Sequence, residues 1–405
     1  MIHYFNPGHE TAVLNASKHY HPPAHVAKMQ SDLASLPIWY ASDGDYVLIN
    51  DVITGLTRNP LIDNISFQEI SHQALNDKCF QQSKVDLWGI SPQSIHLFEK
   101  LNEQYGLSLV VPQWKEEFRF LGSRFASQKI LSKLMGCIPE IEKVILPQFF
   151  SNIEDIEKQI LCHQEKLLIK SPYSSSGRGL IWLPSGKLAQ SERQILSGMI
   201  KKQDQVSIEK VLDKFLDFSM QCEITKQSET QFIGYSIFQT NSKGAYEKSK
   251  LDKQDNFIKL ITSFIEPDLL TKTRIVLSEI LQEMYSPHYT GIIGIDMMIY
   301  KSGDIYYLHP CVEINMRKNM GYLAIRLTEK HLHPDSYGEF TIEYNSKPNI
   351  TMQNHENLQK QFPLIIENKR IKSGYLSLCP VTDETNYHSY IVVRNKSDGL
   401  NLAYQ

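Results

Sequence analysis

The chain has 405 residues, and its 42 Lys and Arg against 45 Asp and Glu give a formal net charge of −3. This length predicts about two or three cores, and the near-neutral balance without a basic block argues against a nucleic-acid partner. No apolar run reaches the roughly 18 residues of a membrane span, and the first residues lack a secretory signal. The six cysteines form no CxxC pair, so reduced thiols and a cytoplasmic location are expected.

The first 115 residues alternate short apolar runs with polar helical stretches. Four runs predict strands, at 2–5, 45–50, 85–90 and 108–112. After the third run, Ser91 and Pro92 are suited to begin a helix. This alternation predicts a small α/β domain with a parallel sheet. Ligands of such sheets bind beyond the carboxyl ends of the strands, where Asn6 to Glu10 and the stretch 88–92 fall.

From residue 116 onward the pattern is that of a larger mixed domain. Helices, antiparallel strands and one hairpin are expected in this part of the chain. The helices are predicted at 116–145, 187–202 and 266–286, the strands at 165–170, 179–183, 206–212, 217–225 and 231–238, and the hairpin at 294–315 with its turn at 301–304. The sequence after residue 335 is polar and rich in loop-forming residues, and its last apolar runs predict a short β appendage.

A loop of small residues follows the apolar strand that ends at Lys170. Serines and glycines fill it up to Arg178 and Gly179, where the next apolar strand begins. Small residues leave backbone N–H groups free to surround phosphate oxygens, and Gly177 and Gly179 permit unusual dihedral angles. The two cations bring positive charge to the same place. A phosphate-binding loop is one interpretation, and an ordinary hairpin loop with a surface arginine is the other.

Two acids and an amide lie in the predicted hairpin strands. Asp296 lies in the first strand, and Glu313 and Asn315 lie two residues apart in the second, so their side chains share a face. Carboxylate and amide oxygens are the ligands that Mg²⁺ prefers. Arg317 continues that face and is suited to a phosphoryl group. The alternative is a solvated strand end, although the intervening residues are apolar.

A connector between two further strands is a weaker candidate. Glu209 ends one apolar run and Asp217 begins another. The connector is suited to offer backbone groups to an adenine edge, with an acid placed for ribose hydroxyls. Taken alone, the pattern also fits an ordinary connection.

Together and in this order, these segments resemble the ATP-grasp family in its carboxylate–amine ligase form, with biotin-carboxylase-like motifs, over roughly residues 116–330. The run VEINMR resembles the family's E-x-N-x-R, and Lys170 with SPYSSSGRG resembles its strand lysine and Gly-rich lid. Ser123 and Arg124 stand where the family has Asp and Lys, which leaves open whether Arg124 or Lys129 reaches the phosphates. The resemblance assigns ATP contacts to Arg124, Lys170, Ser174, Ser175, Ser176, Gly177, Arg178, Gly179, Glu209, Lys210, Val211, Leu212 and Asp217, metal ligands to Asp296, Glu313 and Asn315, and catalytic contacts to Arg317, Lys170 and Arg178.

The resemblance implies an α/β (α+β) ATP-grasp fold in four parts. A Rossmann-like pre-grasp α/β domain is expected at 1–115, a small subdomain with the lid at 116–205, a large subdomain at 206–335, and the C-terminal β appendage at 336–405. No family feature matches the appendage.

The implied activity is an ADP-forming ligase that uses ATP and Mg²⁺, with Mn²⁺ as the alternative ion. A small-molecule carboxylate is activated as an acyl phosphate, and an amine or similar nucleophile then displaces phosphate. A kinase with a stable acceptor and an ATP-binding protein without turnover remain alternatives, and a homodimer is an open possibility. The acceptor candidates are Asn6, His9, Glu10, Tyr246 and Asn319, each of which also fits an ordinary turn or loop.

Overall fold

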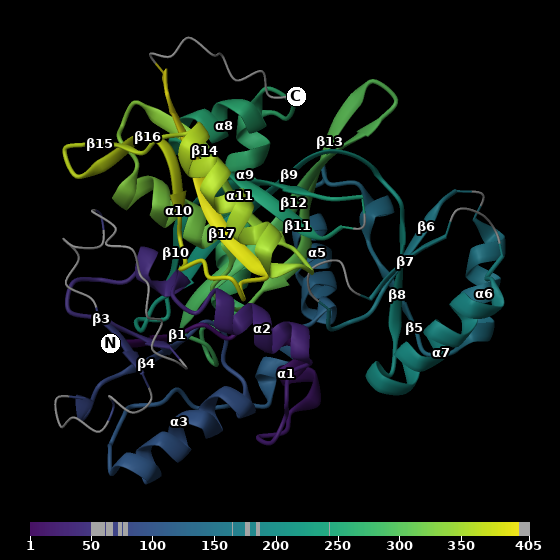
Figure 1. The fold of residues 1–405 in the computed structure, drawn as a ribbon. Helices are drawn as coiled ribbons and strands as arrows, with labels where there is room; N and C mark the ends of the chain where they lie inside the picture. Colours follow the sequence, from purple (N-terminus) through teal and green to yellow (C-terminus); the bar gives the residue numbers. More distant parts are fainter. Residues whose placement is uncertain are drawn as a thin grey trace. The chain divides into compact units, whose positions relative to one another are not determined.

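The computed structural model describes residues 1–49, 80–163, 165–174, 179–183, 187–242 and 244–396, the backbone of 68–71, and Leu61 and Leu75. Figure 1 shows the ribbon. The chain divides into two compact units. Unit 1 comprises Met1–Trp114, Glu247–Phe257 and Arg317–Gln405, and unit 2 comprises Lys115–Tyr246 and Ile258–Met316. The predicted boundary near residue 115 therefore falls where unit 1 first gives way to unit 2.

The first part of unit 1 is the predicted parallel sheet. Its strands are β1 (Ile2–Tyr4), β2 (Tyr46–Ile49), β3 (Gln68–Ser71) and β4 (Val85–Leu87), in the order β3-β2-β1-β4. All three pairings are parallel. The run 108–112 was predicted as a strand, but it forms only an isolated bridge between Val110 and Lys84.

Four helical segments accompany this sheet. They are α1 (His9–Asn15), α2 (Ala24–Asp32), the 3-10 turn η1 (Leu36–Trp39) and α3 (Pro92–Tyr105). As the sequence predicts, the Ser91 hydroxyl caps α3 by accepting a hydrogen bond from the Ser94 amide at 3.2 Å. Phe98 of α3 is fully buried against Tyr4 of β1, so this helix closes one face of the sheet.

The second part of unit 1 is an antiparallel sheet in the order β11-β14-β17-β16-β15. Its strands are β11 (Tyr246–Leu251), β14 (Ser336–Tyr344), β15 (Ile365–Glu367), β16 (Arg370–Ser377) and β17 (Tyr387–Asn395), joined by α10 (Met320–His331) and α11 (Pro348–Gln361). The part expected as a separate appendage at 336–405 is thus a substantial sheet in the same unit as the first 114 residues. Trp39 is fully buried and donates to the Leu378 carbonyl at 2.7 Å, which joins the two parts.

Unit 2 contains a small antiparallel sheet in the order β5-β8-β6-β7. Its strands are β5 (Gln148–Phe150), β6 (Leu167–Lys170), β7 (Leu180–Leu183) and β8 (Val206–Lys210). The helices α6 (Ile153–Cys162) and α7 (Gln190–Gln203) share an apolar core with this sheet. The predicted boundary between 205 and 206 separates β8 from its partners, because β8 pairs with β5 and β6. The chain leaves this sheet at Val211 and Leu212 instead.

The larger part of unit 2 is an antiparallel sheet in the order β13-β12-β9-β10. Its strands are β9 (Asp213–Ile224), β10 (Thr230–Thr240), β12 (Gly291–Ser302) and β13 (Ile305–Asn315). The helices nearby are α4 (Glu117–Leu121), α5 (Arg124–Cys137), the turn η4 (Lys143–Ile145), α8 (Gln254–Thr262), which crosses into unit 2, and α9 (Pro267–Tyr285). The helix predicted at 116–145 is divided because Gly122 and Ser123 end α4 and begin α5.

In the described part of the chain, none of the helices combines the length and the apolar character needed to cross a membrane.

Candidate active site

The predicted metal ligands lie together on the β12–β13 hairpin of unit 2. Asp296 and Glu313 are directly paired across the two strands, and Asn315 pairs with Gly294. The Asn315 side-chain amide donates to an Asp296 carboxylate oxygen at 3.1 Å. The alternation predicted for these strands therefore brings two carboxylates and one amide to neighbouring positions.

A bulge next to this pair changes the direction of β13. The register moves from Asp296 opposite Glu313 to Met298 opposite His309, so β13 carries two more residues than β12 in this stretch. Pro310 lies in the bulge, where its missing N–H costs no ladder hydrogen bond, and β13 is the outer strand of this part of the sheet. Bulges re-aim side chains beside functional sites, and this one lies between His309 and the two acids.

Helix α5 fixes the outer side of β13. The buried hydroxyl of Ser127 accepts a hydrogen bond from the Ile314 amide at 3.1 Å, which satisfies a strand N–H between the two predicted ligands. One turn earlier, the Arg124 guanidinium lies 2.8 Å from Glu313 and 3.4 Å from the Ser174 hydroxyl. Lys129 instead lies over the Phe120 ring. Of the two cations left open by the sequence, Arg124 is the one beside the acidic pair.

A second buried ion pair joins β6 and β8. Lys170 and Glu209 form it with side chains only 8% and 14% exposed. Burial raises the pKa of Glu209, but the charges of Lys170 and Arg124 outweigh it and lower that pKa overall. Glu209 was predicted as part of an adenine hinge, whereas its side chain lies beside the predicted phosphate lysine. Lys170, Glu209 and Arg124, three charged residues of the predicted ATP site, therefore lie close together in unit 2.

His309 is a further residue of this site, on β13. It is fully buried, and it lines a small cavity together with Arg124, Gln128 and Glu209. Burial lowers the pKa of His309 to about 3, so the ring is neutral at pH 7. His309 and Glu209 lie 100 residues apart in sequence, on two different sheets of unit 2, and line one cavity, so no local pattern marks His309.

The predicted hinge has a backbone donor already in use. The Val211 amide donates to the Lys166 carbonyl at 2.9 Å, and the Leu212 carbonyl accepts from Lys214 at 2.9 Å. Lys210 pairs with Glu165 at 2.6 Å. The Val211 N–H is therefore engaged within unit 2 in this conformation.

Asp217, predicted as the ribose contact, lies in β9 with its carboxylate occupied. It pairs with Lys214 at 2.5 Å and accepts a hydrogen bond from the Thr240 hydroxyl at 3.1 Å. The acid is held in one orientation at the start of the strand that follows the hinge.

The described ends of the predicted lid are held together. Ser171 donates through its amide to the Gly179 carbonyl at 3.0 Å. Gly179 has φ of 73°, and a Cβ there would meet the Ser171 hydroxyl at 2.2 Å. Glycine is therefore required at this position. Ser174 lies beside Arg124, and the predicted contacts Ser175, Ser176, Gly177 and Arg178 lie outside the described residues.

Arg317, the predicted phosphate contact, is the first residue after the chain returns to unit 1. Its Nε donates to the Glu10 carboxylate, and its Nη1 donates to the Lys318 carbonyl at 3.0 Å. Two residues of different predicted roles, Arg317 and Glu10, are thus brought together within unit 1.

The other acceptor candidates lie in three different places. Asn6 bonds to Gly89 at 2.7 and 3.1 Å, and His9 Nε2 lies 3.0 Å from the Ile90 carbonyl, so both residues hold the turn after β4. Asn319 caps α10 by accepting a hydrogen bond from the Tyr322 amide at 3.1 Å. Tyr246 was expected on a loop, but it begins β11 and packs near the Phe238 ring.

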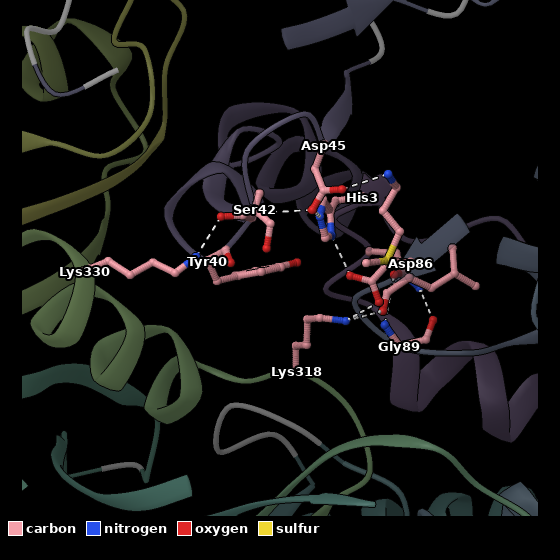
Figure 2. A network of polar contacts seen from close by, with 12 residues as sticks. His3, Tyr40, Ser42, Asp45, Asp86, Gly89, Lys318 and Lys330 are labelled. Atoms are coloured by element: carbon pink, nitrogen blue, oxygen red, sulfur yellow. Dashed lines mark hydrogen bonds and ion pairs between the residues drawn. The ribbon is translucent and has the colours of Figure 1, made fainter. Parts of the chain in front are cut away.

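A buried polar network that the sequence did not single out holds the Arg317 loop to β4 (Figure 2). Lys318 donates to Asp86 at 2.6 Å, and the His3 ring lies between Asp86 at 2.5 Å and Asp45 at 3.0 Å. Burial raises the pKa of Asp86, but Lys318 and His3 outweigh it and hold that pKa well below its usual range. The Lys318 ammonium also lies over the Tyr40 ring. The network fixes the chain immediately after Arg317.

The donor set on the hairpin fits a hard divalent cation. Among the described residues, no group of three or more His, Cys, Asp and Glu side chains is placed to hold a metal ion, so a cage of transition-metal type is not formed there. Asp296, Glu313 and Asn315 offer two carboxylates and an amide oxygen, which suits Mg²⁺ because that ion takes one or two protein carboxylates and completes its shell with water and phosphates.

Comparison with known proteins identifies the fold. No family model matches the sequence, and no curated protein matches it. Solved structures do match. The biotin carboxylase domain of the Hydrogenobacter thermophilus 2-oxoglutarate carboxylase aligns over 96% of this chain and 85% of its own, with a TM-score of 0.52 and 9% identity. Biotin carboxylase from Campylobacter jejuni aligns over 97% and 87%, with a TM-score of 0.52 and 10% identity.

The fold defined by the strands, helices and these likenesses is the ATP-grasp fold. An N5-carboxyaminoimidazole synthetase from Staphylococcus aureus is also similar, over 98% of this chain and 94% of its own, with a TM-score of 0.49 and 14% identity. The expected fold class is confirmed.

Proposed function

We propose that this protein is an ATP- and Mg²⁺-dependent ligase that activates a small-molecule carboxylate as an acyl phosphate for attack by an amine or similar nucleophile. One observation carries the proposal: Glu313, the acid of the E-x-N-x-R run, lies between Asp296 and Arg124 within unit 2. Asp296 is paired with Glu313, and Glu313 is paired with Arg124 at 2.8 Å. The fold agrees with this chemistry, since the similar structures include a carboxylase domain in complex with MgADP.

The residues have separable tasks in this proposal. Asp296, Glu313 and Asn315 would hold Mg²⁺, which when bound offsets phosphate charge. Lys170 and Arg124 bring two cations that are held by Glu209 and Glu313 until an anionic ligand competes for them. Positioning and charge stabilisation account for most of the catalysis of phosphoryl transfer, so these fixed cations suit the first step.

The ends of the lid also suit the proposal. Ser171 and Gly179 are joined by a backbone hydrogen bond, so the segment between them leaves the end of β6 at Lys170 and enters the start of the neighbouring strand β7. A loop anchored in this way can cover phosphates and exclude water, which protects an acyl phosphate from hydrolysis. We include Ser174 to Gly179 in the ATP site on this basis and on the motif.

Ligase chemistry is favoured over a kinase by the α/β domain of unit 1. Its buried polar turns at the carboxyl ends of β1 and β4 offer a place for a second substrate, at the edge where sheets of this kind bind ligands. A kinase would need only one acceptor besides ATP.

The experiment is a screen of ADP formation by the full chain with ATP and Mg²⁺ against pooled carboxylic acids, with and without pooled amino acids and amines. A ligase releases inorganic phosphate only when both substrate classes are present. Phosphate retained on a product in one pool would identify a kinase. Stabilisation by ATP without ADP in any pool would identify a binding protein and overturn the proposal.

A further inference from the structure

Helix α11 is held on the second sheet of unit 1 by few buried side chains. Of its 14 residues, only Thr351 is fully buried, and the Thr351 hydroxyl has no hydrogen-bond partner among the described residues. Within the described part of the chain, a single side-chain hydrogen bond ties the helix to a strand: the His355 ring nitrogen Nδ1 lies 2.6 Å from the Tyr375 hydroxyl of β16. A helix with so few buried contacts opens at a lower free energy than the sheet beneath it.

The Tyr375 hydroxyl continues into a chain of hydrogen bonds below α11. It lies 2.9 Å from Nε2 of His388 on β17, and the same nitrogen lies 3.2 Å from the Ser377 hydroxyl of β16. Tyr375 and His388 are 3% and 1% exposed, whereas His355 is half-buried. The chain therefore runs from a partly accessible ring on α11 to a nitrogen in the interior of unit 1.

The hydrogen bonds of Ser377 fix the direction of this chain. The Ser377 hydroxyl donates to the Cys379 carbonyl at 2.7 Å, and a carbonyl can only accept, so the one proton of Ser377 is committed there. Toward His388 the Ser377 oxygen can then only accept, which places the proton of the His388 ring on Nε2. The Tyr375 oxygen accepts that N–H and donates its own proton to His355. His355 Nδ1 is therefore an acceptor, and Nε2 carries the proton of the neutral ring.

A second proton on the His355 ring can go only to Nδ1. The N–H formed there and the Tyr375 O–H are both donors, so the hydrogen bond that holds α11 is lost. Two carboxylates face this region: Glu343 of β14 accepts a hydrogen bond from the Tyr390 hydroxyl of β17 at 2.7 Å, and Glu356 lies exposed on α11. Burial lowers the pKa of His355, and the Glu356 charge raises it without cancelling that effect.

His388 does not take up the proton in place of His355. Burial, with a smaller contribution from His355, lowers the pKa of His388 to about 3. The His388 ring packs against the Tyr390 ring with 4.8 Å between the centroids, and its Nδ1 is buried without a hydrogen-bond partner among the described residues. A proton added to that nitrogen would find no acceptor, so the response of the chain to acid begins at His355.

We propose that α11 is a strap that acid releases: when His355 takes up a proton, its hydrogen bond to Tyr375 breaks and the helix leaves the sheet. The contribution of this bond is complete above the pKa of about 6.5 that a histidine has in an unfolded chain, and it decreases as the pH falls from there toward the lower pKa of the folded state. The proposal is independent of the ligase function, because none of these residues belongs to the predicted ATP site or to the acceptor candidates.

The test is hydrogen exchange of the full chain, followed by mass spectrometry at about pH 7.5 and about pH 5 and corrected for the intrinsic effect of pH. The backbone of α11 should exchange faster than that of β14, which contains no histidine, because the helix opens while the sheet stays folded. The protection of α11 should fall about tenfold at the lower pH, with a ceiling of about thirtyfold set by the roughly 1.5 pH units below 6.5.

Two variants and a control separate His355 from other causes. His355→Asn keeps an acceptor near the position of Nδ1 but does not titrate, so the fall in the protection of α11 should shrink to less than about twofold. Tyr375→Phe removes the hydroxyl and should lower the protection of α11 already at about pH 7.5. His21→Asn, the same change at an exposed histidine of unit 1, should keep the fall of the unmodified chain.

Three results would contradict the proposal. They are α11 and β14 that exchange together, protection of α11 that does not change with pH, and an unchanged fall in a folded His355→Asn protein. If His355→Asn does not fold, the comparison of α11 with β14 in the unmodified chain and the Tyr375→Phe protein decide the matter.

Discussion

Asp296 and Glu313 face each other as a direct pair on the antiparallel strands β12 and β13. Like charges directly opposite each other destabilise a sheet, and Arg124 offsets one of them at 2.8 Å. The Asn315 amide donates to the other at 3.1 Å. Two apolar residues would pair more favourably at these positions than two acids do. A divalent cation bound by both carboxylates would offset their repulsion.

Replacing Glu313 with Gln should lower ATP turnover by at least about a hundredfold, because one carboxylate ligand and the partner of Arg124 are both lost. The measurement is ADP formation with Mg²⁺, together with the change in thermal midpoint on adding ATP and Mg²⁺. Glu283→Gln, an exposed change on α9 in the same unit, is the matched control and should keep both signals. Unchanged turnover in a folded Glu313→Gln protein would remove Glu313 from the site.

Replacing Lys170 with Met should destabilise unit 2 by about 3–5 kcal/mol, because Glu209 is left as a buried charge without its partner. Adding Glu209→Leu should recover much of that loss, since the buried charge is then gone as well. The free energies of unfolding in urea complete the double-mutant cycle. Lys158→Met, at an ion pair whose lysine is 75% exposed, should cost less than about 1 kcal/mol. Additive losses from Lys170 and Glu209 would mean that the two residues do not act as a pair.

Replacing Ser127 with Ala should cost about 1–3 kcal/mol and lower turnover several-fold. The Ile314 amide, which lies between Glu313 and Asn315, would lose its acceptor inside the protein. Urea unfolding and ADP formation measure the two effects. Ser263→Ala, at an exposed hydroxyl that donates to the Lys259 carbonyl, serves as the control. A loss of stability without any effect on turnover would limit Ser127 to a structural role.

The stability of unit 1 should fall as the pH drops from about 6.5 to about 4. Burial lowers the pKa of His331 from 6.5 to about 4, so between these values the unfolded chain binds more protons than the folded chain. The His331 contribution is complete above pH 6.5, is lost on acidification and is flat below pH 4, with a ceiling of about 3 kcal/mol. His331→Gln keeps a donor for the Trp39 carbonyl, which lies 3.3 Å from the His331 ring. This variant should reduce the slope of the free energy of unfolding against pH by the amount that corresponds to about one bound proton. Identical pH curves for both proteins would contradict the assignment, and comparing the two removes the contribution of His9 and His388.

The sequence predicted the alternation that places Asp296, Glu313 and Asn315 on one face, because strand periodicity is a local property. It also predicted the parallel sheet of unit 1 and the hairpin at 301–304, where the turn residues and apolar runs are strong signals. The strand predicted at 108–112 was wrong: this run has the composition of a strand, but only Val110 pairs, in an isolated bridge with Lys84. Whether such a run pairs depends on neighbours distant in sequence.

The sequence by itself determined the residue types and spacings of the ATP-grasp motifs and the order in which they follow one another, since both are written along one chain. Only the tertiary structure decided which charges meet. It placed Arg124 on Glu313, Lys170 on Glu209 and Arg317 on Glu10. It also joined residues after 336 to the first 114 in one unit. The physical reason is that ion pairing and burial depend on distance in space, and folding brings together residues as far apart along the chain as Glu10 and Arg317, which are separated by 307 positions.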